Sequence, residues 1–324
     1  MQRPPADADW MAAAIALSRR GRAASAPNPN VGCLIVRDGR VVARGWTQAG
    51  GRPHAEAMTI AAAGDAARGA TAYVTLEPCA HASPRGPCCT DALIAAGVAR
   101  VVVAAQDPDP RTNGKGMARL RDAGIAVVEG VLAVEARAAM APWWTRQLAG
   151  RPFVTLKLAT SLDGCIAMGD GSSRWITGDR ARAHGHLERA QHQAILVGRG
   201  TLDADAPRLD VRLAGLADRS PQKLLLTSGN APAGWTAVTS PDAINDVDSV
   251  LVEGGAGAAS AFLAADRVDR LLLYRAPILI GGGKPALGDI GLTDLADAHG
   301  RWRLTDSRLL GSDRLDVYER VREG

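Results

Sequence analysis

Aromatic residues are scarce in this chain, and no apolar run is long enough to span a membrane. Phe, Trp and Tyr make up 4% of the 324 residues, although a hydrophobic content of 47% is enough for two cores. No stretch approaches the roughly 18 apolar residues of a membrane span. The apolar run from Met11 to Leu17 is followed, not preceded, by Arg19 and Arg20, which argues against a secretory signal. We therefore expect a soluble cytoplasmic protein with no membrane partner.

The chain also lacks basic blocks and a disulfide framework. A net charge of +4 and a pI near 9.0 permit an anionic partner, but no basic stripe interleaved with aromatic residues indicates a nucleic-acid partner. A phosphorylated small molecule would explain this charge as well. Five cysteines, an odd number at irregular spacing, favour a reduced compartment and a thiolate metal site.

The most specific motif lies between residues 54 and 89. It consists of His-Ala-Glu at 54–56, Glu-Pro-Cys at 77–79 and Cys-Cys at 88–89. One imidazole and two thiolates are three ligands of a tetrahedral zinc, and a catalytic zinc leaves its fourth position to water. Glu56 is spaced to move protons without binding the metal, as in zinc-dependent nucleobase deaminases.

The residues alone leave two questions about this zinc site open. Adjacent cysteines seldom both bind one ion, so Cys88 and Cys89 are alternatives for the third ligand. A closed structural zinc would need a fourth protein ligand, such as Cys89 or His81, and is the alternative to catalysis.

Strand and helix signals alternate through the chain, which predicts an α/β fold. Gly150-Arg151-Pro152 marks the boundary between two predicted domains, 1–150 and 151–324. In the first half we expect helices at 9–20, 54–63, 91–96 and 131–140, strands at 31–36, 40–45, 72–76, 101–105 and 125–128, and a further helical region opening at Cys79. In the second half we expect strands at 153–158, 194–198, 223–227, 249–252 and 271–274, and a helix at 258–265.

A glycine loop in the second half has the composition of a phosphate site. The predicted strand 249–253 runs into Gly-Gly-Ala-Gly at 254–257 and then into an alanine-rich helix. Backbone N–H groups at such a loop can approach a phosphate, and a helix N-terminus favours its charge. A tight strand-to-helix turn without a ligand is the alternative, because the pattern matches neither common nucleotide-binding motif.

Taken together, these motifs resemble the RibD family of bifunctional riboflavin-biosynthesis proteins. The resemblance covers nearly the whole chain, and its motifs stand at residues 28–32, 54–56, 75–79, 87–94, 157–164, 173–177, 200–205, 207–212 and 252–255. It implies a cytidine-deaminase-like three-layer sandwich, followed by a dihydrofolate-reductase-like α/β domain that uses NADPH.

The resemblance also implies site residues. It places one zinc on His54, Cys79 and Cys88, and it makes Glu56 the proton shuttle. It places Asn28 and His81 at the pyrimidine. In the second half it implies NADPH contacts at Ala159, Trp175, Thr201, Asp205, Gly255, Ala256, Gly257, Ala258, Ala259, Ser260 and Ala261, substrate contacts at Ser173, Arg189, Leu209, Arg212 and Glu253, and Lys157 and Glu253 near the reacting carbon.

The chain departs from the family pattern at three places. The basic residue between the cysteines, Arg85, is displaced by one position. Ala206 replaces the usual second aspartate before a proline, and the region 213–250 is short.

The expected function is two successive steps of riboflavin synthesis on a phosphoribosylaminopyrimidine, carried out by a homo-oligomer, a dimer or tetramer. A first rival is a nucleic-acid deaminase such as a tRNA editor, which the cysteine spacing and the absence of a basic aromatic platform disfavour. A second rival is a zinc-stabilised dimerisation protein, which would have no need of Glu56.

Overall fold

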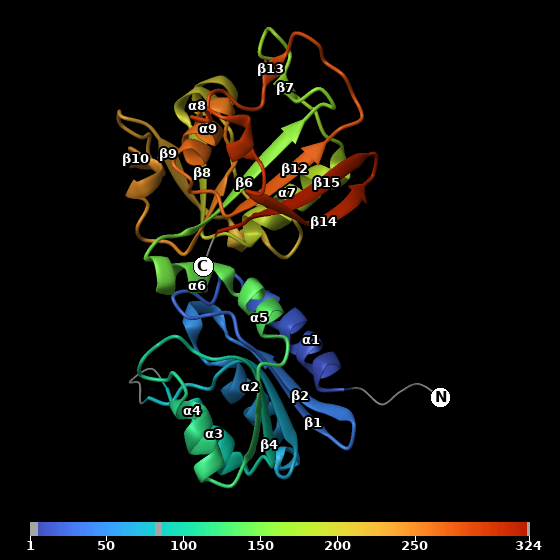
Figure 1. The fold of residues 1–324 in the computed structure, drawn as a ribbon, viewed down its shortest axis with the longest axis vertical. Helices are drawn as coiled ribbons and strands as arrows, with labels where there is room; N and C mark the ends of the chain where they lie inside the picture. The colour runs from blue at the N-terminus through green and yellow to red at the C-terminus, as the bar shows by residue number, and fades with distance from the viewer. Residues whose placement is uncertain (1–5, 82–85, 323–324) are drawn as a thin grey trace. The chain divides into compact units, whose positions relative to one another are not determined.

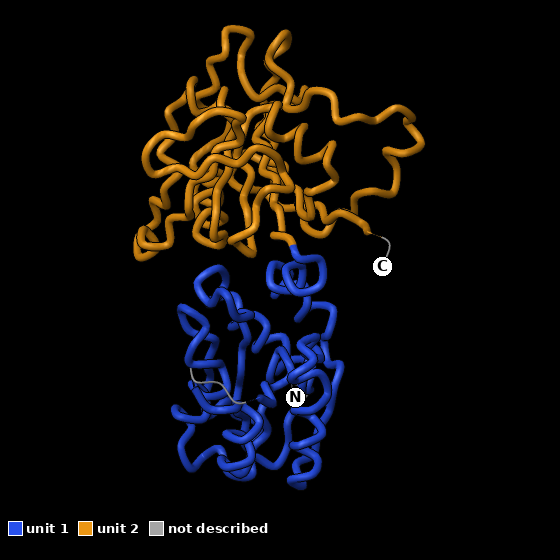
Figure 2. The backbone as a smooth tube through the Cα atoms, turned by 90° about the vertical axis from the view of Figure 1, so that its left-hand side faces the viewer, with its two compact units in different colours: residues 1–150 blue, residues 151–324 orange. Residues whose placement is uncertain are grey.

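The computed structural model describes residues 6–81 and 86–322. The chain forms two compact units, Met1–Gly150 and Arg151–Gly324, drawn in different colours in Figure 2. Arg85 lies outside the described residues. None of the described helices combines the length and apolar composition that a membrane crossing requires.

The first unit is built on a five-stranded sheet in the order β2-β1-β3-β4-β5. Its strands are β1 (Gly32–Arg37), β2 (Arg40–Trp46), β3 (Thr71–Leu76), β4 (Arg100–Ala105) and β5 (Ala126–Glu129). β1 runs antiparallel to both β2 and β3, whereas β3, β4 and β5 are parallel. Asp38 and Gly39 join β1 to β2, and both have positive φ, the conformation that Asp-Gly pairs favour in two-residue hairpin turns.

Helices cover both faces of this sheet and complete three layers (Figure 1). One face packs against Met11 and Ile15 of the first helix and Ala136 of the fifth. The other face packs against Leu93 and Leu120 of the third and fourth helices. The helices are α1 (Asp7–Ser18), α2 (Ala55–Ala63), α3 (Cys89–Ala96), α4 (Lys115–Asp122), α5 (Ala133–Ala139) and α6 (Ala141–Ala149). The predicted three-layer sandwich is confirmed.

Helix boundaries near the zinc motif differ from those predicted. His54 is the N-cap of α2 and not part of its first turn. The expected helix after Cys79 is absent from the described residues, since α3 begins only at Cys89 with Cys88 as its N-cap. α4 and α6 were not predicted, because the glycine at 116 and the proline at 142 weaken the helical signal of these segments.

The second unit is built on an eight-stranded sheet in the order β10-β9-β8-β11-β6-β12-β15-β14. Its strands are β6 (Phe153–Thr160), β8 (Ala194–Gly198), β9 (Gln222–Leu226), β10 (Thr236–Val238), β11 (Ser249–Val252), β12 (Arg270–Arg275), β14 (Trp302–Leu310) and β15 (Asp313–Arg320), and a separate pair is formed by β7 (Cys165–Ala167) and β13 (Lys284–Pro285). In this sheet β10, β9, β8, β11, β6 and β12 all run parallel to their neighbours. The C-terminal hairpin β14–β15 adds two antiparallel strands at the β12 edge.

Helices of the second unit lie on opposite faces of its sheet. The helices are α7 (Asp179–Ala190), α8 (Arg199–Asp205) and α9 (Ala256–Ala264). Phe262 of α9 packs on Leu156 and Val252, whereas Ala181 of α7 packs on Leu272 and Tyr274. Side chains alternate along a strand, so Lys157 of β6 lies on the face that carries α7.

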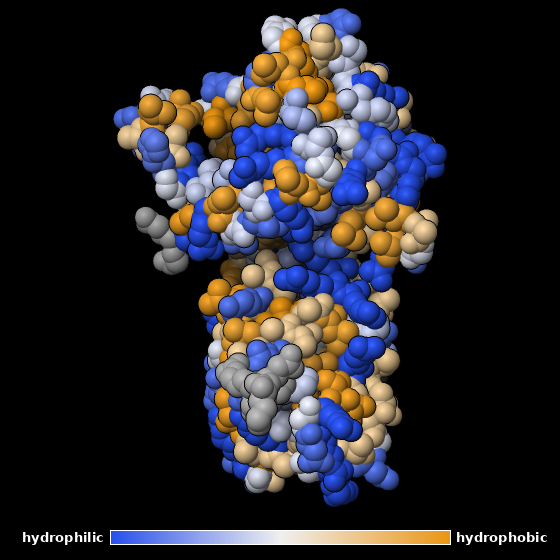
Figure 3. Space-filling model, turned by 90° about the vertical axis from the view of Figure 1, so that its right-hand side faces the viewer, coloured by the Kyte–Doolittle hydropathy of each residue, from blue (hydrophilic) through white to orange (hydrophobic). Residues whose placement is uncertain are grey.

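Hydrophilic and apolar residues are intermixed on the surface of each unit in Figure 3. In that view apolar atoms gather at the end of the second unit that carries β7 and β13. Four apolar side chains in and beside these strands, Leu162, Met168, Ile278 and Leu279, are 40–75% exposed.

Candidate active sites

Three metal-binding side chains of the first unit converge at the edge where parallel strands end. His54 caps α2, Cys79 follows β3, and Cys89 opens α3. His54 Nδ1 lies 3.2 Å from Cys89 Sγ and 3.8 Å from Cys79 Sγ, and the three ligand atoms all lie within 4.8 Å of one another. One imidazole and two thiols at this spacing fit a zinc ion with an open fourth position.

The two thiols of this cluster differ in acidity. A hydrogen bond from Cys89 lowers the pKa of Cys79 to about 4, and His54 adds to this effect. The same hydrogen bond, together with burial, raises the pKa of Cys89. A thiolate is the form that binds metal, so Cys79 is already in that form, whereas Cys89 would release its proton when a metal ion binds.

The predicted ligand Cys88 points elsewhere. Its Sγ donates to the carbonyl oxygen of Cys79 at 2.9 Å, and Arg119 Nη1 lies 3.7 Å from the same sulfur. Cys88 has extended backbone at the N-cap, whereas Cys89 is already helical. Because the chain turns into the helix between them, the two side chains diverge. The structure thus brings Cys89, and not the predicted Cys88, within 4.8 Å of the ligand atoms of His54 and Cys79.

Glu56 lies beside this cluster and is 3% exposed. It stands in the first turn of α2, two residues beyond His54. Burial raises the pKa of Glu56, and the nearby imidazole of His54 opposes this rise. A raised pKa brings a carboxyl group closer to the range in which general acid and base catalysis is efficient.

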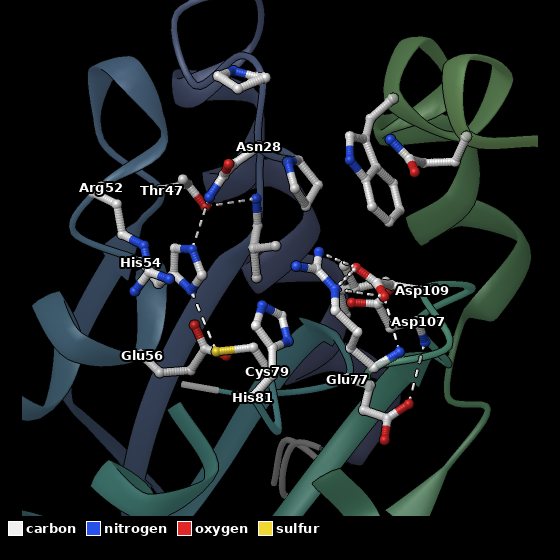
Figure 4. A pocket seen from close by; sticks show the side chains of 17 residues that line it. Asn28, Thr47, Arg52, His54, Glu56, Glu77, Cys79, His81, Asp107 and Asp109 are labelled. Carbon is white, nitrogen blue, oxygen red and sulfur yellow. Dashed lines mark hydrogen bonds and ion pairs between the residues drawn. The ribbon is translucent and has the colours of Figure 1, made fainter. Parts of the chain in front are cut away.

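A cavity of about 280 Å³ opens at the cluster. His54, Glu56 and Cys79 lie on one side of it, and Asp107 and Asp109 lie on the other (Figure 4). The full lining is Pro27, Asn28, Pro29, Val31, Thr47, Arg52, His54, Glu56, Leu76, Glu77, Cys79, His81, Asp107, Asp109, Arg111, Trp143 and Gln147.

Asn28 and His81, both predicted at the pyrimidine, line this cavity. Asn28 Nδ2 donates to Gly51 O at 3.0 Å and lies 2.9 Å from His54 Nε2. His81 Nδ1 lies 3.3 Å from Thr112 Oγ1. Both side chains are therefore held at the wall of the cavity by neighbouring loops.

Sequence reasoning missed the loop after β4 as part of the site. No role in the site was predicted for Asp107 and Asp109, yet both line the cavity with Arg111. Burial raises the pKa of Asp107 to about 6. The carboxyl ends of the parallel strands β3 and β4 meet at one edge of the sheet, and that adjacency was the signal that could have identified this loop.

Glu77 connects the loop after β4 to the segment that carries Cys79 through hydrogen bonds. Its Oε2 accepts from the backbone N–H groups of Asp107 and Gly114 at 3.2 and 2.9 Å. Its Oε1 accepts from Gly116 and Met117 at 3.0 and 3.3 Å. Because Glu77 lies two residues before Cys79, one buried carboxylate joins the cavity wall to the strand that carries a metal ligand.

The second unit brings three predicted residues together in a half-buried ion cluster. Glu253, at the end of β11, accepts from Arg189 Nε and Nη2 of α7 at 2.8 and 2.7 Å. Lys157 Nζ lies 3.7 Å from Glu253 Oε2. Burial alone would raise the pKa of Glu253, but Lys157 and Arg189 outweigh it and lower that pKa to about 2.

The other predicted substrate residues differ in exposure. Arg212, whose side chain is half exposed, lies with its Nε 3.3 Å from His186 Nε2. Leu209 is 4% exposed and packs in an apolar cluster, so its side chain does not line an open site. Ser173 is half-buried in the segment before α7.

Predicted NADPH residues fall into an accessible and a buried group. Gly255 is the N-cap of α9, and its N–H donates to Thr201 Oγ1 at 2.8 Å. Trp175 is 65% exposed and packs under Arg182. In contrast, Ala258, Ala259 and Ser260 are at most 8% exposed, so the helix start is the accessible part of this loop. The remaining predicted residues lie on β6 (Ala159), at the end of α8 (Asp205) and in α9 (Ala256, Gly257 and Ala261).

Comparison with protein families matches both units. Residues 4–105 match the cytidine and deoxycytidylate deaminase zinc-binding region. Residues 152–240 and 243–315 match the RibD C-terminal domain.

Relatives and solved structures match almost the whole chain. The riboflavin biosynthesis protein RibD of Escherichia coli K12 is 39% identical, covering 95% of this chain and 97% of the relative. RibD of Mycobacterium tuberculosis H37Rv is also 39% identical, covering 94% and 95%. The diaminohydroxyphosphoribosylaminopyrimidine deaminase/5-amino-6-(5-phosphoribosylamino)uracil reductase of Thermotoga maritima superposes with a TM-score of 0.88 at 33% identity, covering 97% and 99%. Acinetobacter baumannii RibD, form 1, gives 0.85 at 34%, covering 98% and 99%.

Proposed function

The chain belongs to the RibD family of bifunctional deaminase/reductases of riboflavin biosynthesis, and from this premise we propose how its two units divide the work. Unit 1 deaminates a phosphoribosylaminopyrimidine, and unit 2 reduces the ribosyl chain of the product with NADPH. The observation that carries the proposal is the convergence of His54, Cys79 and Cys89. His54 and Cys79 of this cluster line one cavity together with Glu56.

The substrate of the first step is 2,5-diamino-6-(5-phosphoribosylamino)pyrimidin-4(3H)-one. Water adds to C2 and the 2-amino group leaves as ammonia, so that the pyrimidine becomes a uracil. His54, Cys79 and Cys89 would hold a zinc ion, which when bound makes a water molecule acidic enough to lose a proton near neutral pH.

Glu56 moves the protons of this first step. Its carboxylate takes a proton from the attacking water and delivers it to the departing amine. Its raised pKa brings its proton affinity closer to the working pH. The buried position of Glu56 keeps this exchange away from bulk solvent.

In the second step NADPH, when bound, would supply a hydride for the ribosyl carbon. We assign Lys157 to donate a proton or hydrogen bond near that carbon. Glu253 holds Lys157 in place, and Arg189 in turn fixes Glu253 through two hydrogen bonds. Arg212, half exposed, is the guanidinium available to the substrate phosphate. The N-terminus of α9 and Thr201 would receive a phosphate of NADPH.

We also propose a cytoplasmic homo-oligomer, a dimer or a tetramer. All five cysteines are free thiols, which suits a reducing compartment. The exposed apolar side chains beside β7 and β13 would lose contact with water in an oligomer. Light scattering of the purified protein tests the oligomer, and a monomeric mass at micromolar concentration would refute it.

Assays of the purified protein with the diaminopyrimidine substrate test the function. Ammonia release without NADPH, followed by NADPH oxidation only after deamination, is the expected order. NADPH oxidation without prior ammonia release would contradict the proposed division of work.

A further inference from the structure

The cavity of unit 1 is lined by an arginine side chain that has no role in the proposed deamination. Arg111 lines the cavity, and its side chain is 67% exposed. Its Nε lies 3.0 Å from both carboxylate oxygens of Asp109, and its Nη2 lies 2.5 Å from Asp109 Oδ2. The backbone N–H of Arg111 also donates to Asp109 Oδ1 at 2.9 Å. One edge of the guanidinium is thus fixed by a single carboxylate.

Among residues 6–81 and 86–322, nothing binds the other edge of this guanidinium, which can accept a ligand. A guanidinium carries five N–H donors, and Asp109 engages only those of Nε and Nη2. Within the described residues, Arg111 Nη1 has no hydrogen-bond acceptor. A fixed guanidinium with a free edge is the geometry that proteins use for two parallel hydrogen bonds to a phosphate.

We propose that Arg111 binds the 5-phosphate of the deaminase substrate and that Asp109 is its positioning residue. The inference rests on the proposed function, because it assumes that a phosphoribosylaminopyrimidine enters this cavity. The pyrimidine must reach Glu56 and the metal cluster at the buried side, whereas a phosphate dianion stays where water remains accessible. Arg111 is the more exposed partner of its pair, at 67% against 20% for Asp109.

Electrostatics around Arg111 agree with this role. Asp107 and Asp109 both face the cavity and would repel a phosphate. Arg111 neutralises Asp109, and its hydrogen bonds lower the pKa of that carboxyl, which stays ionised and keeps the guanidinium in place.

A second arginine of the cavity is a matched control. Arg52 lies on the His54 side of the cavity in Figure 4, away from Asp109. Its Nη1 donates to the carbonyl oxygen of Pro87 at 3.3 Å. Arg52 therefore carries the same positive charge as Arg111 and lines the same cavity, but on its opposite side.

The test compares the phosphorylated substrate with the same compound after removal of its phosphate. We expect Arg111→Ala to lower kcat/KM for the phosphorylated substrate by about 10- to 100-fold, mainly through KM, because a charge-assisted hydrogen bond is lost. For the dephosphorylated compound the change should be about twofold at most, with zinc content unchanged. Arg52→Ala should leave the ratio between the two substrates as in the wild type.

A double variant separates direct contact from charge balance. If Arg111 touches the phosphate, Arg111→Ala combined with Asp109→Asn still loses the preference for the phosphorylated substrate. Restoration of that preference in the double variant would show that Arg111 only neutralises Asp109, and would overturn the proposal. A wild type that deaminates both compounds equally well, or a preference that depends on Arg52, would also overturn it. A wild type that deaminates neither compound refutes the proposed function itself.

Discussion

Cys89 Sγ lies 3.2 Å from His54 Nδ1, although Cys89 stands 35 residues further along the chain. Its neighbour Cys88 turns its sulfur to the carbonyl oxygen of Cys79 instead. The thiol of Cys89 therefore faces the imidazole of His54, whereas the thiol of the adjacent Cys88 forms a hydrogen bond to the backbone at Cys79.

The first prediction concerns zinc content. Cys89→Ser should lose the ion, because a hydroxyl is a poor zinc ligand and two protein ligands remain. Cys88→Ser should retain about one zinc per chain, since its side chain only donates to a carbonyl oxygen. Metal analysis of both purified variants measures this. Zinc loss in Cys88→Ser with retention in Cys89→Ser would reverse our assignment.

The second prediction separates the two activities. Glu56→Gln should keep zinc and fold but reduce deamination by roughly 100-fold or more, the usual scale for a general acid/base. Reduction of supplied deaminated substrate should continue at the wild-type rate. Ammonia release and NADPH oxidation are measured on the same preparation. Deamination at a normal rate would place the proton shuttle on another residue.

The third prediction concerns Glu77, which accepts hydrogen bonds from four backbone N–H groups. Glu77→Gln puts an amide NH₂ where some of these donors point, so buried N–H groups lose their acceptor. Unit 1 should lose about 2 kcal/mol or more of unfolding free energy, and KM for deamination should rise. Glu135→Gln, on the exposed side of α5, is the control. Equal stability of the two variants in urea would contradict this role of Glu77.

The fourth prediction tests the cofactor loop. A Cβ at Gly255 would lie 3.2 Å from Thr201 Oγ1, so a branched side chain must displace that hydroxyl. Gly255→Val should weaken NADPH binding strongly, and Gly255→Ala should weaken it less. Fluorescence titration with NADPH measures both, while zinc content and deamination serve as internal controls. Unchanged NADPH affinity in the valine variant would remove this loop from the cofactor site.

The fifth prediction concerns acid stability of unit 2. The pKa of Glu253 is lowered from 4.5 to about 2 in the folded protein. This carboxylate therefore stabilises the fold fully above the unfolded pKa, and its contribution is lost as the pH falls through 4.5 toward 2. At about 1.4 kcal/mol per pKa unit, the contribution is about 3.5 kcal/mol.

Glu253→Gln removes that pH dependence. The variant should be less stable than the wild type at pH 7, and the difference should shrink toward pH 3. Hydrogen exchange of β6 and β11 measures the stability of unit 2 separately from unit 1. A difference that is constant from pH 7 to pH 3 would exclude Glu253 as the titrating group.

Local chemistry made much of the fold predictable. The Asp-Gly pair at 38–39 fixes a two-residue hairpin because both positions need positive φ. Alternating apolar runs predicted most strands of both sheets to within a residue or two. The C-terminal hairpin β14–β15 escaped prediction because most of β14 is exposed, so its sequence carries little apolar pattern.

The sequence by itself determined the kind of chemistry: His54, Cys79, a cysteine pair and Glu56 at these spacings specify a zinc deaminase site. Only the tertiary structure distinguishes the orientations of Cys88 and Cys89, because the direction of two adjacent side chains depends on where α3 begins. Tertiary contacts also decided the cavity wall at Asp107 to Arg111 and the cluster of Lys157, Arg189 and Glu253. Those residues come from elements far apart in the chain, and their proximity is set by which strands pair and which helix covers them, information that no local spacing contains.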